Sequence, residues 1–130
     1  MLKIDAKTDY GLLIMLELAR NSGKIVPLGP LSKHLGVSSP YLSQIAKLLQ
    51  KASLVESREG AGGGYFLSRP AEAIGVMEIL EALSGKMKLR CHHQSCSHFG
   101  HCGLRSAWPL ILEDIKSSLE NRSLASLLLK

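Results

Sequence analysis

Three cysteines and four of the five histidines of the chain lie in one short segment, RCHHQSCSHFGHC, from Arg90 to Cys102. The cysteines are Cys91, Cys96 and Cys102, separated by four and then five residues. Three thiolates at this spacing can converge on one soft metal centre, because thiolate sulfur ligates both structural zinc and iron–sulfur clusters. The spacing differs from the paired CxxC motifs of zinc ribbons. The segment is therefore a candidate metal site of either kind.

The residue types alone leave three interpretations of this segment open. The first is an iron–sulfur cluster held by the cysteines and a fourth ligand that is not cysteine. The second is zinc, with one histidine of the segment completing the site; the candidates are His92, His93, His98 and His101. The third is three free thiols among solvated histidines. The basic residues Lys86, Lys88 and Arg90 lie at its start, where positive charge favours the thiolates that metals require.

Length and charge limit the kinds of protein that this chain can be. Of its 130 residues 45% are apolar, which suits one compact domain, alone or with an extension. The formal net charge of +5 favours a polyanionic partner without identifying one. No apolar run approaches the roughly 20 residues of a membrane span, and the N-terminal stretch has no cleavage site of a signal peptide. We therefore expect a cytoplasmic protein, where clustered cysteines are more often metal ligands or redox thiols than disulfides.

Hydrophobic periodicity predicts the elements that must position this segment. We expect helices over residues 8–20, 30–35, 39–52, 74–83 and 106–119, and a short extended piece over 26–28. Thr8 is expected to cap the first helix. Pro109 is expected within the first turn of the last helix, which would then begin no earlier than about Ser106. Two strands, 54–58 and 65–68, flank a glycine-rich tip and predict a β-hairpin.

The order helix, short helix, tight turn, helix, hairpin is that of a winged helix-turn-helix. The second helix of such a pair can enter the major groove of DNA with its N-terminal residues at base edges, and a glycine-rich wing lets the backbone approach phosphates. The candidate DNA-binding residues are Ser38, Ser39, Tyr41, Ser43, Gln44, Lys47, Arg58, Gly60, Gly62 and Gly63. A plain protein-interaction domain is the alternative, because a serine-rich helix start is also a good N-cap.

Four stretches of the chain resemble the Rrf-two family of winged-helix transcription regulators, which includes IscR and NsrR. They are TDYGLLIMLELA at 8–19, LSKHLGVSSPYLSQIAKLLQKASLVES at 31–57, GAGGGYFLSRP at 60–70, and the three cysteines with Leu104 and Trp108 after them. The resemblance implies a mainly α fold with a β-hairpin wing, and a homodimer on a palindromic operator. It also implies a DNA-binding domain over 1–85, a sensor loop over 86–103 and a dimerisation helix with the C-terminal tail over 104–130.

The resemblance also bears on the metal. Cluster-sensing members carry three cysteines between the wing domain and the long helix, as this chain does. IscR-like members place a histidine three residues after the last cysteine, but that position is Arg105 here, and a guanidinium cannot ligate. NsrR-like members use an aspartate of the first helix, donated by the other subunit, and the matching residue is Asp9. The histidines of the segment remain alternatives, and an acidic residue there also simply stabilises a helix start.

A second departure from the family lies in the wing. IscR-like members often have arginine directly before the first wing glycine, whereas this chain has Glu59 there and Arg58 one place earlier. Because successive side chains of a strand point to opposite faces, Arg58 is expected to face away from the groove that the family's arginine reaches.

Together these features predict a homodimeric DNA-binding repressor controlled by a [2Fe–2S] or [4Fe–4S] cluster that senses iron, nitric oxide or redox state. A zinc- or thiol-based regulator without a cluster is the alternative. We expect no enzyme and no small-molecule substrate, because the chain has no nucleophile–base pair and no glycine loop between a strand and a helix.

Overall fold

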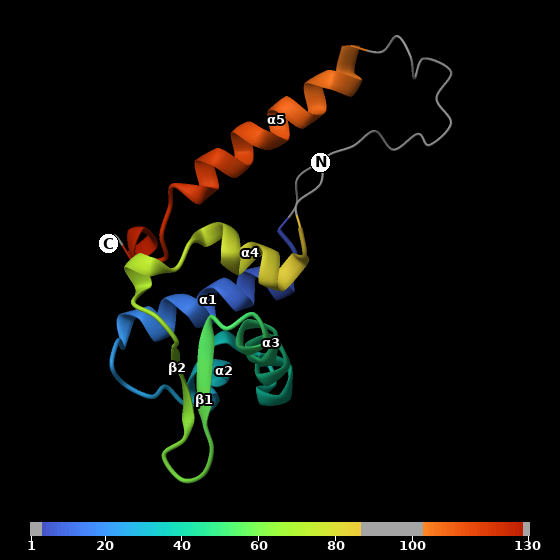
Figure 1. The fold of residues 1–130 in the computed structure, drawn as a ribbon. Coiled ribbons are helices and arrows are strands. Elements are labelled where there is room, and N and C mark those ends of the chain that lie inside the picture. The colour runs from blue at the N-terminus through green and yellow to red at the C-terminus, as the bar shows by residue number, and fades with distance from the viewer. Residues whose placement is uncertain (1–3, 87–102, 129–130) are drawn as a thin grey trace.

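The computed structural model of the chain describes residues 4–86 and 103–128. Its elements are α1 (Ala6–Arg20), α2 (Leu28–Leu35), α3 (Ser39–Lys51), β1 (Val55–Arg58), β2 (Gly64–Leu67), α4 (Val76–Ser84) and α5 (Gly103–Glu120), with short 3-10 turns η1 (Ala71–Ala73) and η2 (Ala125–Leu128) (Figure 1). The order and type of these elements confirm the predicted mainly α fold with a hairpin wing.

The core forms where α1, α3 and α4 pack against one another and against the base of the hairpin. Each helix contributes an apolar stripe at helical spacing; the largest fully buried side chains include Ile14, Met15, Leu18, Leu42, Ile45, Leu49, Ile74, Ile79 and Leu124. α1 and α4 cross closely at Gly11, where an added Cβ would lie 2.4 Å from the Leu83 side chain. This core fixes α3 relative to the hairpin.

The hairpin is antiparallel and pairs Val55 with Leu67 and Arg58 with Gly64. Val26 extends it on the outer side, since its backbone exchanges hydrogen bonds of 2.8 and 2.9 Å with Tyr65. Of residues 26–28, which were expected to be extended, Leu28 already begins α2.

Two predictions about helix starts were wrong. Asp5 rather than Thr8 caps α1, because its carboxylate accepts from the Thr8 N–H at 2.8 Å. The α5 helix begins at Gly103, before Ser106, so Pro109 lies inside it rather than within its first turn. A proline there removes one backbone hydrogen bond of the helix.

The chain after α5 returns to the body of the molecule. Gly75, just before α4, forms an isolated antiparallel bridge with Ser123, and Leu124 is completely buried in the core. In Figure 1 the N-terminal half of α5 projects away from the other helices, while the chain after its C-terminal end brings η2 into contact with η1. Among the described residues, no helix combines the length and apolar character needed to cross a membrane.

Candidate nucleic-acid interface and metal segment

The turn between α2 and α3 is fixed by backbone geometry. Gly36 adopts the left-handed conformation at φ 71°, and its N–H bonds back to the Lys33 carbonyl. Glycine is favoured at such a helix end because it has no Cβ to clash. The Val37 N–H reaches the Ser32 carbonyl at 3.1 Å and tightens the same turn. The two helices therefore meet at a defined angle, as a helix-turn-helix requires.

The two serines at the start of α3 are used within the protein. The Ser38 hydroxyl accepts from the Tyr41 N–H at 3.2 Å and so caps the helix. The Ser39 hydroxyl lies 2.9 Å from that of Ser32, a buried residue whose own hydroxyl donates to the Gly29 carbonyl. Ser38 and Ser39 thus lie at the candidate interface, but both hydroxyls already have partners that fix α3 on α2.

An exposed stripe runs along the face of α3 opposite the core. Gln44 and Lys47 are exposed, one turn apart, and Lys51 continues the stripe. Ser43 is only half-buried, and the ring of Tyr41 packs edge-to-face against Tyr10 of α1, with centroids 6.0 Å apart. An amide followed by lysines on one helix face suits base-edge contact followed by phosphate contact.

The tip of the hairpin depends on glycine for its shape. Gly60 and Gly62 have φ angles of 92° and 75°, which residues other than glycine rarely adopt. A Cβ on Gly63 would lie 2.2 Å from the Arg58 carbonyl oxygen. The Gly63 N–H closes the tip by donating to the Gly60 carbonyl at 3.0 Å. The tip is therefore a tight turn with little side-chain bulk, which leaves its backbone accessible.

Arg58 is the last residue of β1 and is exposed, as is Glu59 beside it. Val55 of the same strand is buried, and alternation therefore puts Arg58 on the face of the hairpin away from the core. There it lines a shallow groove with Phe66 and with Lys24 of the α1–α2 connection. Its guanidinium belongs to the outer face of the wing rather than to the tip.

The candidate metal ligands fall in two parts of the chain. Cys91, Cys96 and Cys102, with the neighbouring histidines, lie outside the described residues. Within residues 4–86 and 103–128, no three His, Cys, Asp or Glu side chains are grouped to hold a metal ion. Asp9 is exposed in the first turn of α1. The preceding residue, Thr8, is tied to Ser84 at the end of α4 by hydroxyls 2.6 Å apart, so the start of α1 lies against the end of α4.

Three residues that stabilise helix starts or join elements were not predicted from the sequence. Asp5 caps α1, and its bonds to Thr8 hold the pKa of this carboxyl below its ordinary value. Glu78 accepts from the Gly75 N–H at 2.9 Å and pairs with Arg69 at 2.8 Å. These two contacts lower the pKa of Glu78. The spacing of Asp5 from Thr8 and of Gly75 from Glu78 is that of helix N-terminal caps, but nothing in the sequence pairs Arg69 with Glu78.

Comparison with known proteins follows this geometry closely. The family model of Rrf2, described as an iron-dependent transcriptional regulator, matches residues 4–130. The regulator IscR of Yersinia pseudotuberculosis is 34% identical over 129 residues, which cover 97% of this chain and 79% of the relative. The IscR of Cereibacter sphaeroides is 41% identical over 85 residues, or 63% of this chain and 55% of that protein.

Solved structures show the same fold. CymR, the global cysteine regulator of B. subtilis, superposes with a TM-score of 0.82 at 32% identity and covers 98% of this chain and 97% of its own. IscR of T. potens has a TM-score of 0.76 at 34% identity, with coverage of 98% and 86%. These relatives are transcription regulators, which confirms the expectation of a regulator rather than an enzyme. The chain belongs to the Rrf2 family and is a winged-helix, DNA-binding transcription regulator.

Proposed function

We propose that the chain acts as a homodimeric repressor whose affinity for a palindromic operator is set by an iron–sulfur cluster. The observation that carries this proposal is the place of the cysteine segment in the order of the chain, between α4 and α5. It connects α4, which packs on α1 and α3, to α5, on which the large apolar side chains of Leu110 and Ile111 are exposed.

The DNA-binding part of the proposal rests on two surfaces, the exposed stripe of α3 and the tip of the hairpin. Gln44 is suited to a bidentate contact with adenine in the major groove, and Lys47 to a phosphate. The tip formed by Gly60, Gly62 and Gly63 has little side-chain bulk, so its backbone can approach phosphates or the minor groove. Ser38, Ser39 and Tyr41 orient the start of α3 through the contacts described above. Ser43 lies half-buried in the same helix. Arg58, on the outer face, is given at most a phosphate contact beside the groove.

The proposed cluster rests on the ligands that the chain can supply. Three cysteines spaced by four and five residues supply soft thiolates, which fit a [2Fe–2S] or [4Fe–4S] cluster. Asp9 of the partner subunit, or a histidine of the segment, would supply the fourth ligand. A hard carboxylate is the weaker ligand and would make the cluster more reactive. Once bound, the cluster would supply a redox and ligand-exchange centre that reacts with nitric oxide or oxygen, or reports iron supply.

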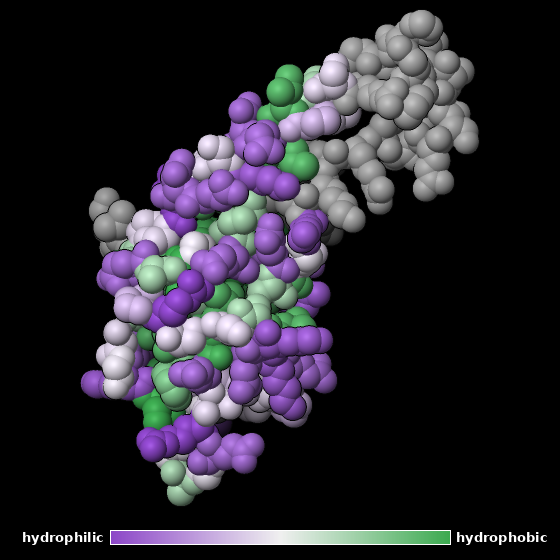
Figure 2. Space-filling view, viewed as in Figure 1, coloured by the Kyte–Doolittle hydropathy of each residue, from purple (hydrophilic) through white to green (hydrophobic). Residues whose placement is uncertain are grey.

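The proposed dimer rests on the exposed apolar side chains of α5. Its C-terminal part packs within the chain, since Ile115 and Leu119 line a cavity with Met77 and Leu80 of α4. Nearer its start, Leu110 and Ile111 are 69% and 41% exposed. Figure 2 shows hydrophobic residues on this projecting part of α5 between hydrophilic ones. Adjacent exposed apolar side chains of this size favour a protein interface, and a second copy of α5 is the occupant we propose.

In this proposal the state of the cysteine segment changes the direction in which α5 leaves α4. Because α5 would pair with its copy, that direction sets the separation of the two α3 helices. A palindromic operator accepts only one separation of its half-sites, so a small change at the segment would alter operator affinity. This is allosteric coupling and requires two states with different contacts.

The test is a selection of duplexes from a random library by protein purified without oxygen, followed by affinity measurements. We expect a palindromic consensus and visible absorption bands, with iron and sulfide in equal amounts. Replacing Cys91, Cys96 and Cys102 together by serine should abolish the bands and change operator affinity about tenfold or more. Identical affinity with and without the cysteines would reject cluster control but leave DNA binding intact.

Zinc is the second candidate, favoured by the four histidines among the cysteines. Protein that is colourless under the same conditions and carries one zinc ion per chain would support it. Since the relatives are transcription factors, we place either form of the regulator in the cytoplasm.

A further inference from the structure

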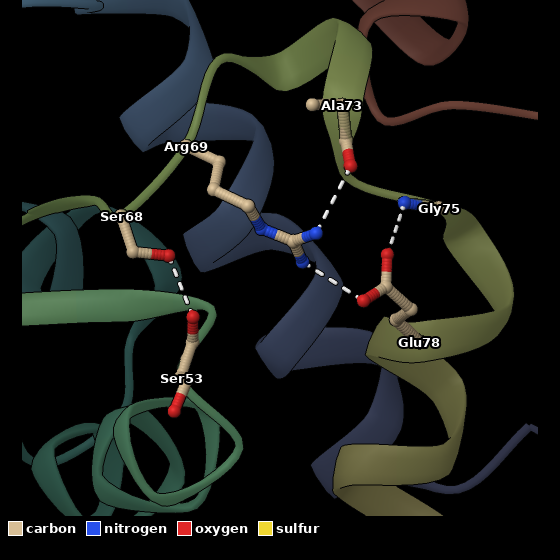
Figure 3. A network of polar contacts seen from close by, with 6 residues as sticks. All are labelled: Ser53, Ser68, Arg69, Ala73, Gly75 and Glu78. Atoms are coloured by element: carbon tan, nitrogen blue, oxygen red, sulfur yellow. Dashed lines mark hydrogen bonds and ion pairs between the residues drawn. The ribbon is translucent and has the colours of Figure 1, made fainter.

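Two side chains connect the wing to the start of α4: Arg69 and Glu78 (Figure 3). Arg69 donates from Nη2 to Glu78 Oε1 at 2.8 Å and from Nη1 to the Ala73 carbonyl at 3.2 Å. The second carboxylate oxygen of Glu78 accepts from the Gly75 N–H at 2.9 Å. One guanidinium therefore contacts the η1 turn and, through Glu78, the first turn of α4.

The same stretch of backbone is also bound by the chain that follows α5. The Val76 N–H donates to the Arg122 carbonyl at 3.0 Å, and the Leu124 N–H donates to the Ile74 carbonyl at 2.7 Å. Leu124 itself is fully buried. Residues 122–124 are thus paired with residues 74–76 at the start of α4. A displacement of α5 along its axis would therefore act on residues 74–76.

On its other side, Arg69 follows directly on the root of the wing. The preceding residue, Ser68, donates its N–H to the Leu54 carbonyl at 3.1 Å and its hydroxyl to the Ser53 carbonyl at 2.6 Å. Ser53 and Leu54 form the turn between α3 and β1. The base of the hairpin and the end of α3 are therefore fixed to one another immediately next to Arg69.

The Arg69–Glu78 pair is expected to stabilise the fold little, but it fixes how the residue after the wing is oriented relative to the start of α4. The side chains of Arg69 and Glu78 are 41% and 48% exposed, and exposed ion pairs typically contribute little to the stability of a fold. Their removal should therefore leave the domain folded. The forked guanidinium nevertheless defines direction as well as distance, because its two donors reach two different acceptors.

We propose that Arg69 and Glu78 are positioning residues of the wing, and that they transmit the position of residues 122–124 at the end of α5 to the hairpin. Neither residue contacts DNA in this proposal. It rests on the proposed function where it concerns operator affinity, whereas the mechanical link can be measured without DNA. A coupling of this kind must be shown by the response of one end to a change at the other.

The first experiment measures hydrogen exchange of the hairpin amides in the full-length protein. Leu124→Val perturbs one end of the link while retaining an apolar side chain. We expect it to speed exchange of the β1 and β2 amides at least threefold in the wild-type background, and clearly less in Arg69→Ala and Glu78→Gln backgrounds. Equal acceleration in all three backgrounds would overturn the proposal.

Arg20→Ala supplies the matched control, because it removes another exposed pair, Arg20 with Glu17 at 3.6 Å, which lies within α1 and does not join the wing to α4. In the Arg20→Ala background Leu124→Val should act as in the wild type. Arg69→Lys should restore part of the coupling, since it keeps the charge and loses the fork.

The second experiment measures the affinity of the same variants for the selected duplex. Arg69→Ala should weaken binding about three- to tenfold relative to Arg20→Ala. Unchanged affinity together with altered hairpin exchange would support the link while contradicting the wing's part in the proposed function. Unchanged affinity with unchanged exchange would overturn the proposal itself.

Discussion

At the scale of single residues, the candidate interface separates into side chains that shape it and side chains that are available to DNA. The hydroxyls of Ser38 and Ser39 are bonded within the protein. Gln44 and Lys47 are exposed, and no side-chain hydrogen bond or ion pair occupies them in the described part of the chain. Recognition is therefore expected from the exposed pair, and orientation from the serines.

Gln44→Ala should weaken binding to the selected duplex by about 1–3 kcal/mol, roughly 5- to 150-fold in Kd, and relax the preference at one base pair. Lys47→Ala should instead weaken binding to all duplexes alike and reduce the salt slope of log K by about 0.9, because one phosphate contact is lost. Fluorescence anisotropy over a range of salt concentrations distinguishes the two, with Lys116→Ala on α5 as the control. A uniform loss on Gln44→Ala would contradict base readout.

The glycines of the wing give a second prediction at this scale. Gly63→Ala should lower the free energy of unfolding by about 1–3 kcal/mol, because its Cβ would lie 2.2 Å from a backbone oxygen that cannot yield. Gly62→Ala meets open space and has only its positive φ to overcome, about 1–2 kcal/mol. Gly29→Ala, in α2 with open space around it, should be stabilising by about 0.5–1 kcal/mol. Urea unfolding measures all three, and an equal effect at Gly63 and Gly29 would contradict the clash.

At the scale of elements, two of the helices begin with a carboxylate bonded to backbone N–H groups. Asp5 caps α1 and Glu78 caps α4. A helix start leaves N–H groups without partners, and a negative charge there also interacts favourably with the helix dipole. The start of α1 contacts the end of α4, which leads to the cysteine segment, and the start of α4 contacts Arg69 next to the wing. Fraying at either start would therefore loosen the elements that carry the proposed function.

These caps predict a pH dependence of stability. The Thr8 contacts lower the pKa of Asp5 from an ordinary value of 3.8, and the Gly75 and Arg69 contacts lower that of Glu78 from 4.5. A carboxyl whose pKa is lower in the folded state stabilises the fold fully above its ordinary pKa, and the contribution disappears as pH falls through the folded value.

Asp5→Asn and Glu78→Gln should therefore be less stable than the wild type at pH 7, and the difference should shrink as the pH falls below about 4. Thermal unfolding between pH 7 and pH 3 measures it. A difference that stays constant over this range would contradict the assignment of the caps.

At the scale of the whole molecule, α5 is divided between two tasks. Its C-terminal part packs on α4 and leads into residues 122–124, which pair with residues 74–76. Its N-terminal half projects from the body and exposes Leu110 and Ile111. A helix anchored at one end and apolar at the other can join two copies while remaining rigidly connected to each DNA-binding core.

Replacing Leu110 and Ile111 together by glutamate should convert the proposed dimer to monomer, because charges would be buried in the interface. Sedimentation equilibrium measures the association, and Glu113→Ala on the same helix is the control for helix content. Operator affinity should fall with the loss of the dimer. An unchanged dimer would place the interface elsewhere.

The sequence by itself determined the order of elements, the helix-turn-helix, the glycine tip and the set of three cysteines. These are local properties: hydrophobic spacing, turn residues and ligand chemistry are all written in consecutive positions. The family resemblance added the regulator function, which the comparisons confirm. The ligand set, the dimer and the signal remain predictions.

Only the tertiary structure decided which polar groups have partners. It showed that Ser39 bonds Ser32, that Arg69 binds Glu78, and that residues 122–124 pair with the start of α4. Such contacts join segments far apart in the chain, and their geometry depends on how the core packs. The same holds for Pro109, which the sequence assigned to the first turn of α5: the helix begins at Gly103, so the proline lies inside it.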